Sequence, residues 1–370
     1  MMAAILGVIV GVALICGILW DCFETIVLPR SVNRKFRFAR FFYTNAWRFW
    51  SALSRLFQRE SAQDGFLSNF GPLSLILLLN VWAACMIFGF ALIHWSLGSP
   101  FNAPEKHLGF GSYIYVSGTT FFTLGLGDVT PLSTCARVLT VLEAAVGFGF
   151  LAVVIGYLPV IYQAFSRREV GISLLDSRAS SPPSASELLR RHAESGRIDS
   201  LIQILTDLER WAGDLLESHL SYPVLAFYRS QHDRESWLAA LTTVLDACAL
   251  IEIAEDRTAA WQAGLTFAMA RHAAIDLALI FQIRPATHTL SRLPPPDLAR
   301  IRETLADAGF PLREDEEAGA KLIEMRRGYE PYVIALAQRF LLVLPRWIAM
   351  GETMDNWETS AWDRQHFLGH

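Results

Sequence analysis

The chain has 370 residues, of which 52% are hydrophobic and 18% are charged, and its mean hydropathy is +0.31. This composition is too apolar for an ordinary soluble protein and too charged for a chain that lies wholly in a membrane, so we expect one part in lipid and another in water. The formal net charge of −4 gives no basis for nucleic-acid binding. The five cysteines form no Cys-x-x-Cys pair, which argues against a disulfide framework or a zinc site.

Residues 1–29 are predicted to form an N-terminal membrane helix. Met1–Trp20 is an uninterrupted apolar run that is long enough to cross hydrocarbon. It lacks the basic start and the small-residue cleavage site of a signal peptide, so we expect it to be retained. Asp21 and Glu24 follow it, and we expect them to reach the interface or to pair with Arg30 rather than to coordinate an ion.

Residues 30–69 read as a basic, amphipathic segment at the membrane surface. Seven arginines and one lysine are interspersed here with phenylalanine, tyrosine and tryptophan, and no acid precedes Glu60 within the segment. Cationic side chains at lipid phosphates and rings at the acyl boundary suit a bilayer containing anionic lipids, and a nucleic-acid patch fits poorly between two spans. The positive-inside rule places this segment in the cytoplasm, so in the cell membrane the N-terminus is expected outside.

Residues 70–168 are predicted to form a pore domain of two spans around a re-entrant loop. The first span, about 70–97, runs outward, and a short helix is expected over about 112–122. The last span, about 135–165, runs inward and ends at Arg167 and Arg168, again basic on the cytoplasmic side.

The loop between these spans contains Thr-Leu-Gly-Leu-Gly-Asp at residues 123–128. A dehydrated cation needs a ring of oxygens in place of its water, and backbone carbonyls can supply one if successive carbonyls point the same way. Glycine reaches positive φ without steric cost, so Gly125 and Gly127 allow the alternating backbone that this requires. Thr123 would add a hydroxyl at one end, and Asp128 a carboxylate at the other.

This stretch resembles the selectivity filter of the potassium channel family. The resemblance covers about residues 70–165 and implies an all-α pore of two spans around a loop, with potassium as the permeant ion and no cofactor; the N-terminal helix brings the expected number of spans per chain to three. The ion-binding residues that it implies are Thr123, Leu124, Gly125, Leu126, Gly127 and Asp128. Because one loop supplies a quarter of a carbonyl ring, a homotetramer is expected. Leu126 stands where the family usually has tyrosine or phenylalanine, so strict selectivity for potassium over sodium does not follow.

The last span carries glycines that have two interpretations. In the resembling family this helix often bends at a glycine twenty residues past the second filter glycine, a position that Gly147 matches, and Gly149 lies close by. They would act as a gating hinge, or they would permit close packing of helices. The predicted cavity lining is one face of the same helix, consisting of Phe148, Leu151, Ala152 and Ile155.

Glu143 is predicted to support the filter from the last span. A carboxylate at this depth is costly unless it is paired or hydrogen-bonded. We expect it to face the short helix over about 112–122, the pore helix, and to form a hydrogen bond with the hydroxyl of Tyr115, Thr119 or Thr120. The alternative is that it reaches outer water or pairs with Arg137.

Residues 169–186 are predicted to form a polar linker, followed by a cytoplasmic helical domain over 187–370. Its apolar periodicity predicts helices at 188–220, 237–254, 259–283, 298–308 and 318–350, all in water. The domain has no Gly-x-Gly-x-x-Gly nucleotide motif and no catalytic triad. Its histidines, among them His232 and His288, do not stand at metal-ligand spacing. The sequence leaves open whether it binds a cytoplasmic ligand.

Together these features favour an all-α cation channel that is gated or assembled by its cytoplasmic helical domain. A non-conducting membrane receptor or scaffold with a pore-like fold is the alternative, which Leu126 keeps open. An enzyme in the C-terminal domain is a third class that no residue constellation supports.

Overall fold

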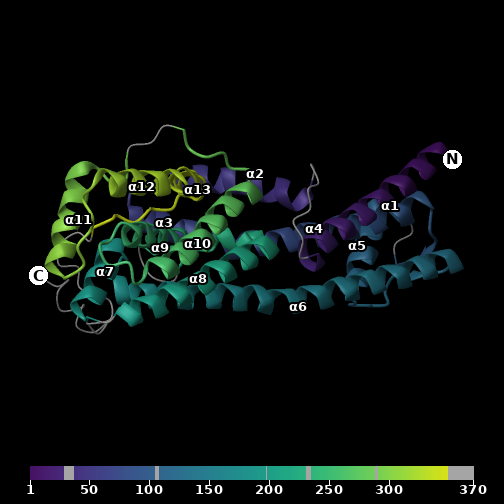
Figure 1. Ribbon diagram of the computed structural model, residues 1–370. Coiled ribbons are helices and arrows are strands. Elements are labelled where there is room, and N and C mark those ends of the chain that lie inside the picture. Colours follow the sequence, from purple (N-terminus) through teal and green to yellow (C-terminus); the bar gives the residue numbers. More distant parts are fainter. Residues whose placement is uncertain (29–36, 105–107, 197, 231–234, 288–290, 349–370) are drawn as a thin grey trace, which may run out of the picture. The chain divides into compact units, whose positions relative to one another are not determined.

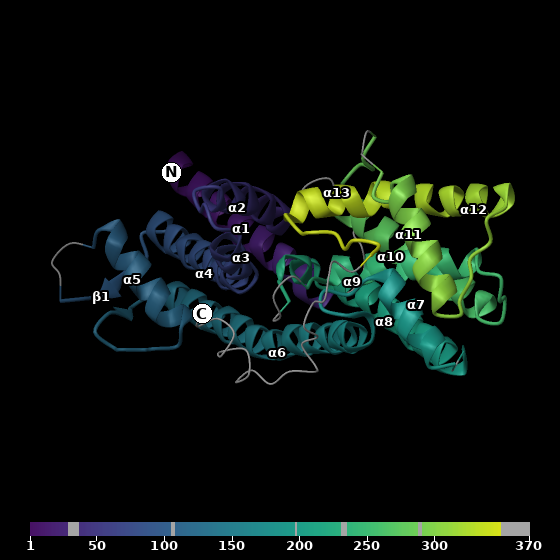
Figure 2. The ribbon, with the colours of Figure 1, turned by 90° about the vertical axis from the view of Figure 1, so that its left-hand side faces the viewer.

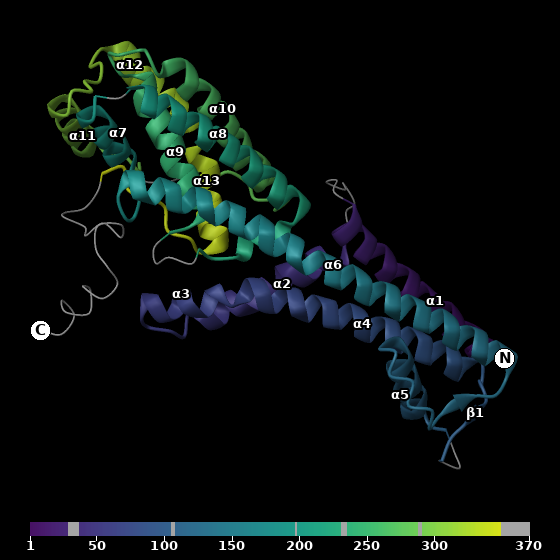
Figure 3. The same ribbon diagram turned by 90° about the horizontal axis from the view of Figure 1, so that it is seen from below.

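The computed structural model describes residues 1–28, 37–104, 108–196, 198–230, 235–287 and 291–348. These residues are mainly helical, and their strands are two of two residues each, which confirms the predicted all-α fold class (Figures 1 and 2). The chain divides into two compact units, Met1–Gln163 and Ala164–His370. Helix α6, Thr134–Ala179, is one continuous helix whose residues belong to both units (Figure 3).

The first unit begins with α1, Met2–Cys22, which continues as a short π-helix over Phe23–Val27. Helix α1 packs along α4, Phe70–Ser96. A Cβ placed on Gly11 would lie 2.8 Å from the Gly89 carbonyl oxygen, and one on Gly89 would lie 3.2 Å from the Gly11 carbonyl oxygen. The two glycines therefore let the backbones approach closely, as small residues do between membrane helices.

Between the π-helix and α4 the described residues form two helices, α2, Phe38–Ser54, and α3, Glu60–Ser68. Helix α2 buries Trp47 edge-on against Phe70 and leaves Phe41 and Phe49 exposed. Such a one-sided apolar face is the pattern expected of a helix at the membrane surface. The predicted basic residues Arg30, Arg34 and Lys35 lie outside the described residues.

Asp21 has a structural role that the sequence did not indicate. It is 5% exposed, and its carboxylate accepts hydrogen bonds from the Ala39 backbone N–H and from Trp82 Nε1, each at 3.1 Å. It thus ties the start of α2 to α1 and α4. Glu24 is buried too and accepts a 2.7 Å bond from Trp20 Nε1, so protein groups hold both carboxylates, while the expected partner Arg30 lies outside the described residues.

The pore loop lies between α4 and α6. It begins with strand β1, Phe101–Asn102, followed by the short helix α5, Phe110–Phe121, and ends with strand β2, Thr130–Pro131. The strands pair antiparallel, with Phe101 opposite Pro131. This pairing brings the two ends of the loop together, and α5 and residues 122–129 lie in the chain between the paired strands.

The second unit is a helical domain built around α9, Trp237–Glu252, whose residues from Trp237 to Ile251 are all buried. Helix α10, Ala260–Ile280, packs on α9, and α8, Ile198–Ser221, packs on the same α10. The remaining elements are α7, Ala185–Glu194, a 3-10 turn over Pro223–Phe227, α11, Pro295–Asp307, α12, Glu316–Arg327, and α13, Glu330–Phe340.

Two of the predicted helices in this unit are each divided in the structure. The helix expected over 188–220 is interrupted after Glu194, where Gly196 has φ +64°, and the helix expected over 318–350 ends at Arg327 and restarts at Glu330. Pro331 in the first turn of α13 lacks the N–H that would continue α12. The predicted linker from residue 169 is helical as far as Ala179.

Among the described residues, four helices are long and apolar enough to cross a membrane: Met2–Val27, Ser61–Ser96, Thr134–Ala179 and Ala260–Ile280. The first three contain the predicted spans. The fourth includes α10, which we expected to be a helix in water. Its Ala263, Thr266 and Ala270 are fully buried, and it packs on α8 and α9.

Candidate functional site

The backbone of the pore loop alternates in hand. Thr123, Gly125 and Gly127 have φ of +56°, +55° and +80°, whereas Leu124 and Leu126 lie outside the left-handed region. Glycine adopts positive φ freely, but threonine does so at a cost on the order of 1–3 kcal/mol. The alternation thus begins one residue before the first glycine, in a strained conformation that sequence reasoning missed.

The C-terminal end of the pore helix holds this loop through backbone groups. The Thr119 carbonyl accepts from Leu124 N at 2.8 Å and from Gly125 N at 3.5 Å, and the Thr120 carbonyl accepts from Thr123 N at 3.0 Å. Thr119 and Thr120 therefore contact the loop through their carbonyls. The Thr119 hydroxyl instead donates to the Val116 carbonyl of its own helix.

Tyr115 and Asp128 connect the other end of the loop to the pore helix. The Tyr115 hydroxyl donates to Asp128 Oδ2 at 2.7 Å, and Asp128 Oδ1 accepts from Val129 N at 3.0 Å. Asp128, predicted as an ion-binding residue, is thus also a contact to the pore helix. Tyr115 is engaged here, which removes it as the expected partner of Glu143.

Glu143 is fully buried, which excludes the alternative that it reaches outer water. Arg137 donates to the Pro131 carbonyl, and no hydrogen bond joins Glu143 to Tyr115, Thr119 or Thr120 within the described residues. The expected hydroxyl partners and the expected arginine partner are therefore both wrong.

The groups that do face Glu143 come from two other helices. His94 Nε2 of α4 lies 4.0 Å from Glu143 Oε2, and the Ser117 hydroxyl of α5 lies beside the same carboxyl. All three side chains are at most 1% exposed, and none of these facing atoms has a hydrogen bond of standard geometry. A histidine within an apolar span was the available sequence signal, because such residues are costly there.

Gly147 lies one helical turn beyond Glu143 and contacts the pore helix through its backbone. A Cβ at this position would stand 2.0 Å from the Phe121 carbonyl oxygen, whereas one on Gly149 would meet nothing within 4 Å. Helix α6 continues without a break through both glycines. This geometry favours the close-packing interpretation for Gly147, and the hinge stays a prediction for both.

The residues predicted to meet ions or line a cavity are exposed in the isolated chain. Leu124 and Leu126 are 61% and 63% exposed, and on α6 the exposed positions include Phe148, Leu151, Ala152 and Ile155. Exposed apolar side chains on a continuous face indicate an interaction surface, with lipid or with other subunits.

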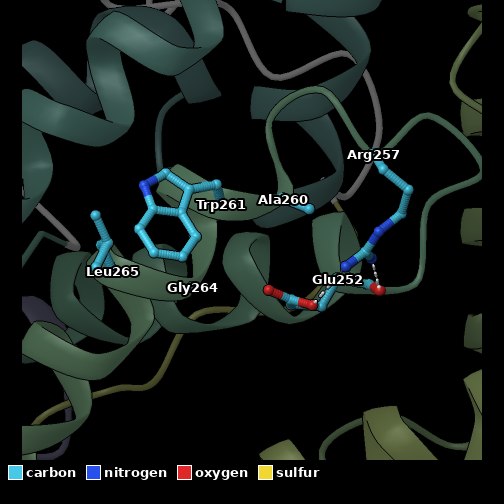
Figure 4. Close-up of a pocket in the computed structure, with 6 residues that line it drawn as sticks. All are labelled: Glu252, Arg257, Ala260, Trp261, Gly264 and Leu265. Carbon is cyan, nitrogen blue, oxygen red and sulfur yellow. Dashed lines mark hydrogen bonds and ion pairs between the residues drawn. The ribbon is translucent and has the colours of Figure 1, made fainter.

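A cavity of about 350 Å³ in the second unit is lined by Glu252, Arg257, Ala260, Trp261, Gly264 and Leu265 (Figure 4). Its two charged side chains already pair with each other, with Arg257 Nη2 3.2 Å from Glu252 Oε2. Trp261 is 79% exposed at the rim, so the cavity is open and offers little enclosed surface to a small ligand. No cluster of three metal-ligating side chains occurs among the described residues. His232 and His288 lie outside them.

Comparison with known proteins identifies the pore region. Residues 76–163 match the family Ion_trans_2, described as an ion channel. The chain is 26% identical over 190 residues to the uncharacterized membrane protein YdjJ of Bacillus subtilis (strain 168). That match covers 50% of this chain and 54% of the relative, so the chain spans about half of the relative's length. No solved structure shows a significant match. The predicted resemblance to a channel pore is thereby confirmed for this region of a membrane protein.

Proposed function

We propose that this chain is a subunit of a cation channel that conducts potassium through a ring of backbone carbonyls at residues 123–127, with Asp128 at its mouth. The observation that carries the proposal is the alternating φ of Thr123, Gly125 and Gly127, directly after a pore helix and inside the region that matches an ion-channel family. Carbonyl rings of this kind replace the hydration shell of a permeant ion.

The proposed assembly is a homotetramer. One loop per chain supplies one quarter of a ring, and a closed ring needs cyclic symmetry. The exposed apolar residues of α6 and of the loop are the surface that neighbouring subunits and lipid would cover. The mass of the detergent-purified particle tests this, since a stable dimer would contradict it.

Rubidium uptake into liposomes that contain the purified protein tests conduction. The matched variant is Gly125→Ala. A Cβ there meets nothing within 4 Å, so the substitution strains the backbone at φ +55° without a clash. We expect uptake in wild type and at least a tenfold loss in the variant, with the tetramer intact. Absence of uptake in wild type would favour the alternative of a non-conducting receptor or scaffold.

Selectivity is proposed to be weaker against sodium than in relatives with an aromatic residue between the filter glycines. Leu126 has no hydroxyl to bond the surrounding helix, so the ring of oxygens is less rigidly held. Reversal potentials in mixed potassium and sodium decide this. Equal rejection of sodium by wild type and Leu126→Tyr would contradict the argument.

Gating is proposed to act through α6. Its cytoplasmic half packs on α8, where a Cβ on Gly171 would stand 2.0 Å from Trp211 Cδ1 and where Trp211 Nε1 donates to the Arg168 carbonyl at 3.1 Å. A ligand or partner of the helical domain could therefore move the helix that lines the pore. We further propose that the N-terminus lies outside the cell, that the helical domain is cytoplasmic and that α2 contacts anionic lipids.

A further inference from the structure

Three buried polar side chains lie close together, one each from α4, α5 and α6. His94 comes from α4, Ser117 from α5 and Glu143 from α6, and their exposed fractions are 1%, 0% and 0%. Leaving such groups without partners is costly in an apolar interior, and a lone carboxylate costs most. We therefore expect an interaction that satisfies these groups. His94 Nε2 and Glu143 Oε2, 4.0 Å apart, are close enough to provide one.

The histidine is held on its other side by the turn that follows α4. His94 Nδ1 lies 3.1 Å from Ser99 Oγ, and the Tyr113 hydroxyl of the pore helix donates to the Ser99 carbonyl at 3.2 Å. The imidazole also packs edge-on against Phe101 of β1. These contacts fix the ring so that Nε2 points toward α6.

We propose that His94 is a positioning residue for the pore loop, which acts by sharing one proton with Glu143 between the imidazole Nε2 and carboxyl Oε2. With the proton on Oε2, the carboxyl donates to a neutral imidazole. With the proton on Nε2, an imidazolium faces a carboxylate. Nδ1–H donates to Ser99 Oγ in both states, and the pair keeps zero net charge, which avoids an isolated charge in the apolar interior.

Ser117 carries the effect of this pair to the loop. Its hydroxyl lies beside the Glu143 carboxyl, and it precedes by two residues Thr119, whose carbonyl holds Leu124 N and Gly125 N. The Gly147 contact with the Phe121 carbonyl secures the same helix one turn further along α6. Displacing the pair would therefore shift the Thr119 carbonyl and the backbone that it holds.

The inference rests on the proposed channel function for its functional readout, which is the rubidium-to-sodium permeability ratio. We expect His94→Leu to lower this ratio by about tenfold, the usual scale for losing a residue that orients an ion-binding group. His94→Gln retains an amide near the position of Nε2 and should recover most of the ratio. The double variant His94→Leu/Glu143→Leu should be no worse than the worse single variant, because both remove one pair.

The control is His272→Leu, which alters an exposed histidine of the helical domain and should leave the ratio unchanged. Equal ratios in wild type and His94→Leu would overturn the positioning role, as would additive effects in the double variant or failure of His94→Gln to recover. Absence of wild-type flux would overturn the channel proposal and this role with it.

A second measurement tests the pair without conduction. Nitrogen-15 spectra of histidine-labelled protein, assigned by difference from His94→Gln, should show a hydrogen-bonded Nε2 whose resonance moves in Glu143→Leu. A resonance that does not respond to Glu143→Leu would overturn the proton sharing itself.

Discussion

Each unit contains a buried carboxylate, and the two carboxylates differ in how completely their oxygens are hydrogen-bonded. In the helical domain Asp246, 1% exposed, receives both terminal nitrogens of Arg292 at 3.0 and 2.7 Å and a hydrogen bond from the Tyr329 hydroxyl. Arg292 also donates to the Pro345 carbonyl at 2.9 Å. In the pore unit Glu143 has His94 and Ser117 beside it, and neither of its oxygens has a hydrogen bond of standard geometry within the part of the chain that the structure describes.

The difference separates a group that holds a fold from one that is available to function. A bidentate arginine with further bonds satisfies a buried charge completely, so removing one partner strands the other. A carboxyl with incompletely used oxygens retains the freedom to change partners or protonation. We therefore expect stability to depend on Asp246 and conduction to depend on Glu143.

The largest expected effect is on the stability of the helical domain. Arg292→Ala should lower its free energy of unfolding by about 3–5 kcal/mol, because Asp246 is left as an uncompensated buried charge. Denaturant unfolding of the full chain in detergent, followed by far-ultraviolet circular dichroism, measures this. The control is Arg210→Ala. Arg210 is exposed and its Nη1 lies 3.6 Å from Asp207 Oδ1, so its loss should lower the free energy of unfolding by no more than about 1 kcal/mol. Equal losses in the two variants would break the comparison.

Next in size is the effect of filling the contact between α6 and the pore helix. Gly147→Ala places a Cβ against backbone that cannot give way cheaply, so we expect a loss of about 1–3 kcal/mol together with reduced flux. Gly149→Ala is the matched control, since nothing lies within 4 Å of its Cβ. If Gly149→Ala alone impaired flux, a hinge at Gly149 would replace close packing as the explanation.

Glu143→Gln should change function while changing stability little. The amide keeps the shape of the side chain and carries no charge to bury, so we expect an unfolding free energy within about 1 kcal/mol of wild type. We expect an altered rubidium-to-sodium permeability ratio, because the amide cannot share a proton with His94. Glu324→Gln, on the surface of α12, serves as the control. Unchanged permeability and open probability in Glu143→Ala, with assembly intact, would remove Glu143 from the mechanism.

A pH dependence of stability is expected to centre on Glu235, a buried carboxyl of the helical domain. Burial, together with the neighbouring carboxylates Asp176 and Glu169, raises its pKa from 4.5 to about 8. The folded domain thus binds a proton that the unfolded chain has lost, and its stability falls as pH rises from about 4.5 to about 8. Glu235→Gln should flatten the melting temperature across pH 5–8. A slope equal to that of wild type would assign the dependence to other groups.

The features that the sequence determined are local in the chain. The length of an apolar run decides whether a helix can cross hydrocarbon, and it located the three spans that the helices at Met2–Val27, Ser61–Ser96 and Thr134–Ala179 contain. A glycine at alternate positions decides which residues can take positive φ, and Gly125 and Gly127 do so. The ends of helices were less predictable, since the break between α12 and α13 depends on a proline within a long apolar pattern.

The tertiary structure alone decided which side chains meet. Thr123 joins the positive-φ alternation because the carbonyls of Thr119 and Thr120 hold the chain that follows. Asp21 caps α2 instead of facing water, and Glu143 faces His94 instead of Tyr115, because the packing of separate helices sets the rotation of each about its axis. Spacing along one helix gives the face on which a residue lies, but the partner on that face comes from a distant part of the chain.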